Sequence, residues 1–430
     1  MAEIRAFDGL RYDPARAGDP ASLMAPPYDV VDDEGRAELA ARSPSNAIHF
    51  ILPEGEGDAK YPVGAARFRE IAAAAMVRDD APSVYLYHQR FEVEGETFVR
   101  KGFIALIELT RFGHGPVLAH ERTLAGPKRD RLELMRACQA HLELVFGMFS
   151  DPQRRWEGIV DPQRGEPVLQ ADFDGAHHTL WRIHDEAAIA ALTEHLRPLK
   201  IYIADGHHRY ETMCAFREEL EAAGHPEAKW GMIYLSNLDD PGLVVLPTHR
   251  LAHDLPAVDL PAVLDSLAPW FHHTEAPLPG DAAAMREALA TDGPATFGLA
   301  VPGAGTLHVL RLRDDFDPAA AGLGGLAPAL QRLDVALLHE LVLERALGIT
   351  KAAQEAKTNL YYYKSTERAL AAAAGQGDEE VQLVCLMNAT PVSDVVAVCD
   401  GGEVMPQKST FFYPKIPNGL VFRDLELRKG

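Results

Sequence analysis

Five polar residues, Asp205-Gly-His-His-Arg209, lie between an apolar stretch and a segment with helical spacing. Leu199 to Ile203 predicts a buried strand, and the segment that follows the turn predicts a helix ending near Gly224. A strand entering a helix in this way directs backbone N–H groups and the positive end of the helix dipole to one place. The guanidinium of Arg209 suits phosphate or carboxylate. The turn is therefore a candidate anion site, or else a glycine-containing connection with solvated histidines.

Two further stretches combine cations with a carboxylate: His120-Glu-Arg-Thr123 and Gly126-Pro-Lys-Arg-Asp-Arg131. The second leads into a predicted helix, for which Asp130 is a candidate N-cap and whose apolar side includes Leu142 and Val145. A charged helix start is the alternative interpretation. A single glutamate between histidine and arginine seldom serves packing, so we favour a functional role for Glu121.

Near the C-terminus, Met405-Pro-Gln-Lys-Ser-Thr-Phe-Phe-Tyr-Pro-Lys415 places lysines and hydroxyls among aromatic residues. Such a mixture suits a phosphate or nucleotide pocket, although a tail that seals a core would also use the aromatic residues. The prolines of Met24-Ala-Pro-Pro-Tyr-Asp-Val-Val31 make that segment rigid, as a pocket wall or a surface connection. Thr248-His-Arg250 ends a predicted strand and is a weaker candidate for the same pocket.

Together these stretches predict phosphoryl transfer, because cations and helix-end N–H groups stabilise phosphate oxygens while a carboxylate accepts a hydroxyl proton. Two adjacent histidines in one turn cannot easily share a tetrahedral zinc ion. Mg²⁺ held by a carboxylate and a phosphate fits better, since it keeps most of its waters. The sequence has no G-x-x-x-x-G-K-[ST], H-E-x-x-H or G-x-S-x-G motif.

The composition limits the partners. Hydrophobic residues make up 47% and charged residues 24%, an ordinary globular balance, and the formal net charge of −21 argues against general nucleic-acid binding. No apolar run approaches the ~18 residues of a membrane span. The four cysteines are far apart and predict reduced core residues. We expect a soluble cytoplasmic protein that acts on a small phosphate-bearing molecule, without an indicated oligomeric state.

The hydrophobic pattern predicts a mixed α/β chain. Predicted strands are 46–52, 83–93, 97–109, 199–203, 230–236, 243–250, 297–301, 307–312, 381–387 and 395–399. Predicted helices are 61–78 and 334–347, besides those after the two polar turns, and residues 319–329 predict a loop. We divide the chain into an N-terminal α/β unit (1–110), a core with the phosphate-binding turn (111–255), an appended α/β subdomain (256–330) and a C-terminal segment that completes the pocket (331–430).

Five of these motifs resemble the DUF1015 family, over residues near 1 to near 425: Ala25-Pro-Pro-Tyr-Asp29, His120-Glu-Arg-Thr123, Pro127-Lys-Arg-Asp-Arg131, Ala204-Asp-Gly-His-His-Arg-Tyr210 and Met405-Pro-Gln-Lys-Ser-Thr410. The Asp205–Arg209 turn in turn resembles the G-x-x-R phosphate-binding motif of the ParB/sulfiredoxin superfamily, which includes kinases of free serine. This resemblance implies a ParB/sulfiredoxin-like core with N- and C-terminal α/β elaborations. Sulfiredoxin has a cysteine where this chain has His207, which argues against its reductase chemistry.

The resemblance implies a nucleotide-dependent serine kinase or a phosphoserine phosphatase that uses Mg²⁺ with ATP or ADP. The alternative is a non-catalytic, ParB-like nucleotide-binding regulator. The candidate catalytic residues are His120, Glu121, Asp205 and His208, with Asp205 also the candidate metal ligand. The candidate phosphate- or nucleotide-binding residues are Lys128, Arg131, Gly206, His207, Arg209, Lys408, Ser409 and Thr410. The candidate substrate-binding residues are Tyr28, Asp29, Arg122, His249 and Arg250.

Overall fold

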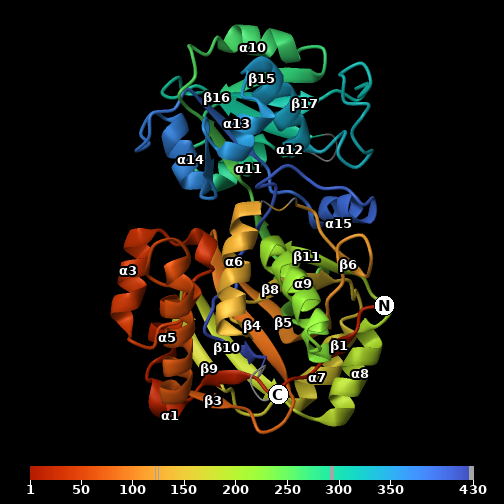
Figure 1. The fold of residues 1–430 in the computed structure, drawn as a ribbon. Helices are drawn as coiled ribbons and strands as arrows, with labels where there is room; N and C mark the ends of the chain where they lie inside the picture. The colour runs from red at the N-terminus through yellow and green to blue at the C-terminus, as the bar shows by residue number, and fades with distance from the viewer. Residues whose placement is uncertain (122, 124, 291–294, 426–430) are drawn as a thin grey trace. The chain divides into compact units, whose positions relative to one another are not determined.

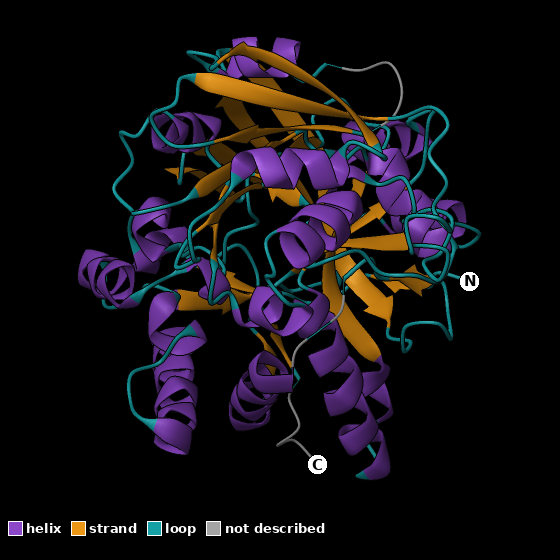
Figure 2. Cartoon of the chain, turned by 90° about the horizontal axis from the view of Figure 1, so that it is seen from above, coloured by secondary structure: helices purple, strands orange, loops and turns teal. Residues whose placement is uncertain are grey.

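The computed structural model describes residues 1–121, 123, 125–290 and 295–425 (Figure 1). Its contacts divide the chain into two compact units. Unit 1 contains the described residues of 1–119, 123–244 and 414–430, and unit 2 those of 120–122 and 245–413. Both units combine helices with a sheet, which confirms the predicted mixed α/β class (Figure 2). Unit 2 therefore draws on three of the four predicted segments, 111–255, 256–330 and 331–430.

Unit 1 is built on a nine-stranded mixed sheet in the order β6-β11-β8-β12-β5-β4-β10-β9, with β1 paired to β5. Two strand pairs are parallel, β11 with β6 and β12 with β8, and the others are antiparallel. The strands of unit 1 are β1 (Ile4–Arg5), β2 (Leu10–Tyr12), β3 (Met76–Arg78), β4 (Val84–Val93), β5 (Glu96–Glu108), β6 (Val117–Leu118), β7 (Ala140–His141), β8 (Val145–Phe149), β9 (Leu169–Phe173), β10 (Ala176–Ile183), β11 (Ile201–Asp205), β12 (Trp230–Asn237) and β21 (Arg423–Asp424).

The helices of unit 1 include short 3₁₀ turns, labelled η, as well as α-helices. They are α1 (Pro14–Ala17), α2 (Pro20–Leu23), η1 (Tyr28–Val30), α3 (Asp33–Arg42), α4 (Ile48–Ile51), η2 (Gly57–Ala59), α5 (Lys60–Ala75), α6 (Ala125–Cys138), α7 (Arg155–Val160), η3 (Asp161–Gln163), α8 (Glu186–Leu196), α9 (His207–Ala222) and η4 (Pro226–Lys229).

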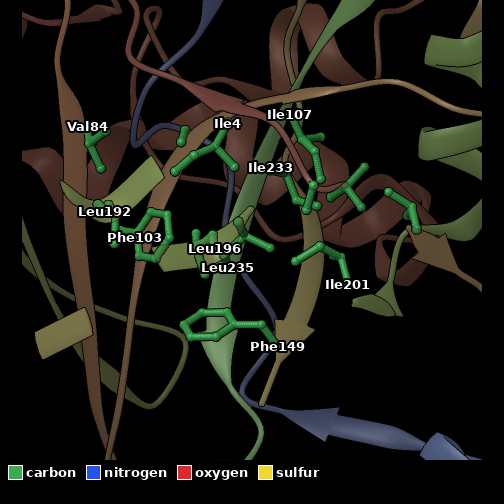
Figure 3. Packing of buried hydrophobic residues seen from close by; sticks show 14 of the residues in the cluster. Ile4, Val84, Phe103, Ile107, Phe149, Leu192, Leu196, Ile201, Ile233 and Leu235 are labelled. Atoms are coloured by element: carbon green, nitrogen blue, oxygen red, sulfur yellow. The ribbon is translucent and has the colours of Figure 1, made fainter. Parts of the chain in front are cut away.

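The core of unit 1 forms where alternate residues of the central strands face α7, α8 and α9. Figure 3 shows part of this cluster, in which Phe103 of β5, Phe149 of β8 and Leu235 of β12 lie close to Leu192 and Leu196 of α8. Each such side chain stabilises the fold by roughly 1.5–3 kcal/mol when fully buried. The core thus fixes the strands that carry the polar turn.

Unit 2 contains a six-stranded antiparallel sheet in the order β15-β17-β16-β19-β14-β18, and a separate pair of β13 with β20. One helical stretch has π geometry and is labelled η5. The elements are β13 (Val244–Leu246), β14 (His249–Ala252), α10 (Leu260–Leu267), β15 (Phe271–Pro277), α11 (Ala282–Ala288), β16 (Thr296–Ala300), β17 (Thr306–Leu312), α12 (Asp334–Leu337), η5 (Leu338–Ala346), α13 (Lys351–Ala356), β18 (Leu360–Tyr363), α14 (Thr366–Ala373), β19 (Leu383–Met387), α15 (Val392–Asp400) and β20 (Phe411–Tyr413).

Two predicted strands are wrong. The stretch 46–52 contains the helix α4, because the Asn46 side chain accepts a hydrogen bond from the Ile48 N–H and donates to the carbonyls of Ser22 and Met24, which turns the chain. Residues 395–399 lie in the helix α15, where Val395, Val398 and Cys399 are buried at helical spacing.

Three other predictions need correction at their boundaries. The predicted helix 61–78 ends at Ala75, and residues 76–78 form the strand β3. The predicted strand 243–250 is two strands, β13 and β14, that are interrupted at Pro247 and Thr248. Asp130 is not an N-cap, because α6 already begins at Ala125, and Val145 belongs to β8 rather than to the helix. The predicted hairpins β4–β5 and β16–β17 are confirmed.

Candidate phosphate-binding turn

The polar turn connects β11 to α9 through Gly206, whose backbone is left-handed at φ 87° and ψ 32°. A Cβ atom at Gly206 would lie 2.9 Å from Nε and 3.0 Å from Cζ of Arg209. Glycine is therefore required here both by the backbone conformation and by the guanidinium packed beneath it. The first N–H groups of any α-helix lack partners within the helix, so α9 begins with the donors that an anion site uses.

A half-buried carboxylate, that of Asp205, fixes that guanidinium. Nη2 of Arg209 lies 2.5 Å from Oδ2 of Asp205, and Nη1 donates to the carbonyl of Leu144. Nζ of Lys415 donates to the other oxygen, Oδ1, of Asp205. Arg209 is only 6% exposed. The Asp205 carboxylate thus lies between two cations, Arg209 of the same turn and Lys415 from near the C-terminus.

The pKa values of this group follow from its charges. Burial would raise the pKa of Asp205, but Lys415 and Arg209 outweigh burial and hold that pKa well below its usual range. Burial would likewise lower the pKa of Arg209, but Asp205, Glu143 and Asp29 outweigh it and the pKa is raised. Asp205 and Arg209 are therefore both charged at neutral pH.

A second buried cation, Arg131 of α6, lies in the same unit. Its guanidinium contacts Asp130 at 2.6 Å and Glu143 at 3.1 Å, and Nη1 donates to the carbonyl of Ile51 in α4. The guanidinium carbon lies 4.0 Å from the ring centre of Tyr28. Burial, followed by the charge of Glu143, raises the pKa of that tyrosine to about 12. Within unit 1, Arg131 therefore connects its own stretch, 126–131, to the stretches 24–31 and 46–52.

A small pocket separates the two arginines. Arg131, Glu143, Arg209 and His141 line it, together with apolar side chains of α6 and α9, helices that pack against each other (Figure 1). Oε1 of Glu143 and Nδ1 of His141 are buried without a hydrogen-bond partner in the described part of the chain. The pocket measures about 30 Å³. That is room for roughly two water molecules and is too small for a nucleotide.

The remaining predicted residues of unit 1 surround the turn. Nζ of Lys128 lies 3.1 Å from Oε2 of Glu211 in α9, and both side chains are about one-third exposed. His207 is buried and its charge interacts with Asp205, whereas His208 is half-buried. Asp29 is exposed. Of these residues, Lys128 links α6 to α9 through its contact with Glu211.

Unit 2 contains the other predicted set. Nε2 of His120 lies 2.9 Å from the Thr410 hydroxyl, and the Met405 N–H donates to the His120 carbonyl at 2.7 Å. The backbone of Glu121 forms a parallel bridge with Met405. The stretches 120–121 and 405–410 are therefore neighbours.

Lys408 and Ser409 lie in the loop that precedes β20. The Lys408 backbone is left-handed at φ 58°, and its carbonyl accepts from Nη2 of Arg250 at 2.9 Å. The Ser409 hydroxyl donates to the Pro406 carbonyl at 2.5 Å, and the Ser409 carbonyl accepts from the Thr390 hydroxyl. These hydrogen bonds fix the loop.

His249 and Arg250, predicted to bind substrate, are 0% and 1% exposed. Nδ1 of His249 accepts from the Met387 N–H at 3.1 Å, so its Nε2 carries the proton and donates to Thr366 at 3.2 Å. Burial, with a smaller contribution from Arg250, lowers the pKa of His249 to about 3. These contacts fit packing of the sheet, and substrate contact would require that packing to open.

The predicted residues thus form two sets. Unit 1 contains Tyr28, Asp29, Lys128, Arg131 and Asp205 to Arg209, and unit 2 contains His120, Glu121, His249, Arg250 and Lys408 to Thr410. Arg122 lies outside the described residues. That both sets act on one ligand stays a prediction. Sequence reasoning missed Glu143, and it named Lys415 only as part of an aromatic stretch; a second lysine there was the available signal.

A metal role for Asp205 fits this geometry poorly, because both of its oxygens are bonded to cations. In the part of the chain that the structure describes, the group of side chains that could hold a metal ion is elsewhere, in unit 2. We therefore assign Asp205 a positioning role. None of the described helices is long and apolar enough to cross a membrane.

Comparison with protein families identifies the chain's relatives. A family model described as "Protein of unknown function (DUF1015)" matches residues 4–336, which include the polar turn and the Arg131 cluster. The chain belongs to the DUF1015 family. The expected resemblance is thereby confirmed. A comparison with curated proteins gives no match for this DUF1015 protein.

Solved structures similar to this DUF1015 protein include a conserved hypothetical protein from Pyrococcus furiosus. The two sequences are 15% identical, the match covers 72% of this chain and 93% of that chain, and the TM-score is 0.34. A free serine kinase in complex with AMP has 16% identity, coverage of 71% and 88%, and a TM-score of 0.32. SbnI from Staphylococcus aureus, truncated at its C-terminus, has 9% identity, coverage of 73% and 88%, and a TM-score of 0.34. At these values the likenesses say nothing about the activity of this chain.

Proposed function

We propose that this chain transfers a phosphoryl group between a nucleotide, ATP or ADP with Mg²⁺, and a small hydroxyl metabolite, with free L-serine or O-phosphoserine as the first substrate pair to test. One observation carries the proposal. At the start of α9, the guanidinium of Arg209 packs against Gly206 and is held there by Asp205. Serine is chosen because the turn resembles the G-x-x-R motif of a superfamily that contains free serine kinases.

The electrostatics of the turn support phosphate binding. Arg209 and Lys415 exceed the charge of Asp205 by one, and the helix dipole of α9 adds to this potential at the same end. Donors that are fixed before the reaction stabilise the charge on phosphate oxygens without having to reorganise. Because the neighbouring pocket is too small for a nucleotide, we place the phosphates against the N–H groups of the turn rather than between Arg131 and Arg209.

The reaction we propose balances as follows. The serine hydroxyl oxygen attacks the terminal phosphorus of the nucleotide, the bond from that phosphorus to its bridging oxygen breaks, and a carboxylate accepts the hydroxyl proton, a role for which the sequence makes Glu121 the candidate. Mg²⁺ arrives with the nucleotide and neutralises its oxygens, so no metal ligand from the turn is needed. Lys128, Lys408 and the hydroxyls of Ser409 and Thr410 are further candidates for phosphate contact.

The proposal is tested by ³¹P NMR of the purified chain with Mg²⁺, in one tube with ATP and L-serine and in another with ADP and O-phosphoserine. We expect phosphate to move between nucleotide and serine, or inorganic phosphate to be released from O-phosphoserine. No movement in either direction would refute the serine proposal.

Two variants separate an enzyme from a nucleotide-binding regulator. Glu121→Gln should keep ADP affinity, measured by calorimetry, and lose turnover by roughly 10²–10⁴-fold, the usual contribution of a general base. Glu403→Gln is the matched control, because Glu403 is an exposed carboxylate of the same unit. Binding of ADP without phosphate movement in the wild type would identify a regulator instead.

A further inference from the structure

Three side chains with metal-binding atoms gather on the outer strand pair of the unit 2 sheet. His273 and Glu275 are two residues apart on β15, the edge strand, so both point to the same face. His308 of β17 is the register partner of Glu275. The strand pairing therefore brings two imidazoles and one carboxylate together, although the sequence separates His308 from the other two by more than thirty residues.

We infer that His273, Glu275 and His308 form a binding site for a divalent transition-metal ion of the Zn²⁺ type. Nε2 of His273 lies 3.1 Å from Nδ1 of His308, and Oε1 of Glu275 lies 3.7 Å from the same Nδ1. One ligand atom from each of the three lies within 4.8 Å of the others. In a tetrahedral site with bonds of about 2.0–2.1 Å, ligand atoms are roughly 3.3 Å apart. The separations of 3.1 and 3.7 Å lie on either side of that value.

Protein contacts alone explain the arrangement less well. A single N–H···N hydrogen bond accounts for the two histidines, whose rings are 5.3 Å apart and inclined by 25°. The carboxylate at 3.7 Å from the imidazole nitrogen is beyond hydrogen-bond distance. A metal ion between the three atoms would bind all of them with small side-chain movements.

The chemistry of the ligands selects the metal. Two imidazole nitrogens with one carboxylate suit Zn²⁺, Co²⁺, Ni²⁺ or Cu²⁺, whereas Mg²⁺ and Ca²⁺ prefer oxygen ligands alone. His273 and Glu275 are exposed, which leaves the fourth position of a tetrahedral ion to water.

The test uses the full chain without a histidine tag, stripped of metal by chelation and dialysis. Zn²⁺ is titrated in competition with a chromophoric chelator, and Co²⁺ binding is followed by visible absorption, which reports tetrahedral geometry. The wild type should bind one ion per chain at this site and gain thermal stability on binding. His273→Ala and His308→Ala should weaken binding by more than about 100-fold, because the loss of an outer-shell partner alone costs roughly 10–100-fold.

His272→Ala is the matched control. His272 is exposed on the same strand but pairs with Arg311 and points to the opposite face, so its loss should leave binding unchanged. Glu275→Gln, which keeps the shape of the side chain, should weaken Zn²⁺ binding and change the Co²⁺ spectrum. The inference is overturned if the wild type binds no Zn²⁺ at micromolar concentration. It is equally overturned if His273→Ala and His308→Ala bind as the wild type does.

Discussion

Replacing Gly206 by alanine tests whether the guanidinium beneath the turn is fixed. A left-handed alanine costs about 1–2 kcal/mol. The new Cβ would also lie 2.9–3.0 Å from the Arg209 guanidinium, which must then move away from Asp205. Loss of such a charge-assisted hydrogen bond costs about 1.5–3 kcal/mol. We therefore expect Gly206→Ala to lower the free energy of unfolding by about 2.5–5 kcal/mol, the sum of the two contributions, measured by urea denaturation.

The other end of α9 offers a matched control. Gly224 has φ +90°, close to the +87° of Gly206, but a Cβ there would meet no atom within 4 Å. Gly224→Ala should therefore cost only the backbone contribution of about 1–2 kcal/mol. In an Arg209→Met background, Gly206→Ala should lower the free energy of unfolding by only this backbone contribution. Equal losses for the two glycine variants in the wild-type background would refute the claim that Arg209 is held in place.

Further variants test single contacts. Lys415→Met should destabilise the fold by about 3 kcal/mol at pH 7 by leaving Asp205 with one cation, whereas Lys229→Met, at an exposed pair, should cost under about 1 kcal/mol. Because the pKa of folded Asp205 lies below its unfolded value, the Lys415 effect should be complete above about pH 4 and decline in more acidic urea titrations. The pKa of His249 is about 3 when folded, so the unfolded chain gains a proton below about pH 6.5 that the fold excludes. Exclusion of this proton should lower the free energy of unfolding by about 2 kcal/mol as the pH falls from 6.5 to 5. His249→Phe should abolish this loss of stability. Lys128→Met should change stability by under about 1 kcal/mol but weaken ADP binding in calorimetry, and unchanged affinity would exclude it as a phosphate ligand.

Local patterns predicted the fold wherever short-range chemistry decides it. The alternating strands around Glu94 and Gly95 form the predicted hairpin, and the apolar spacing after Arg209 is that of α9. The strand predictions for 46–52 and 395–399 failed because β-branched and aromatic residues are also accepted in short buried helices. There the hydrogen bond from the Ile48 N–H to the Asn46 side chain, and the burial of Val395 and Val398 at helical spacing, override strand propensity.

The site was predictable to the extent that its residues are close in sequence. Asp205, Gly206 and Arg209 occupy one turn, so their joint role could be inferred from spacing. The pairing of Lys415 with Asp205 spans 210 residues, and no local pattern encodes it. The metal-binding triad depends in the same way on the register of β15 and β17, which the sequence does not specify.

The central claim is that the turn at the start of α9 holds a phosphate group. A crystal structure of the chain soaked or grown with ADP and Mg²⁺ measures this directly. We predict a phosphate oxygen within hydrogen-bond distance, roughly 2.7–3.2 Å, of the N–H groups of His207 or His208, above the guanidinium of Arg209. Density for ADP at another surface, with this turn unoccupied at saturating ADP, would contradict the claim.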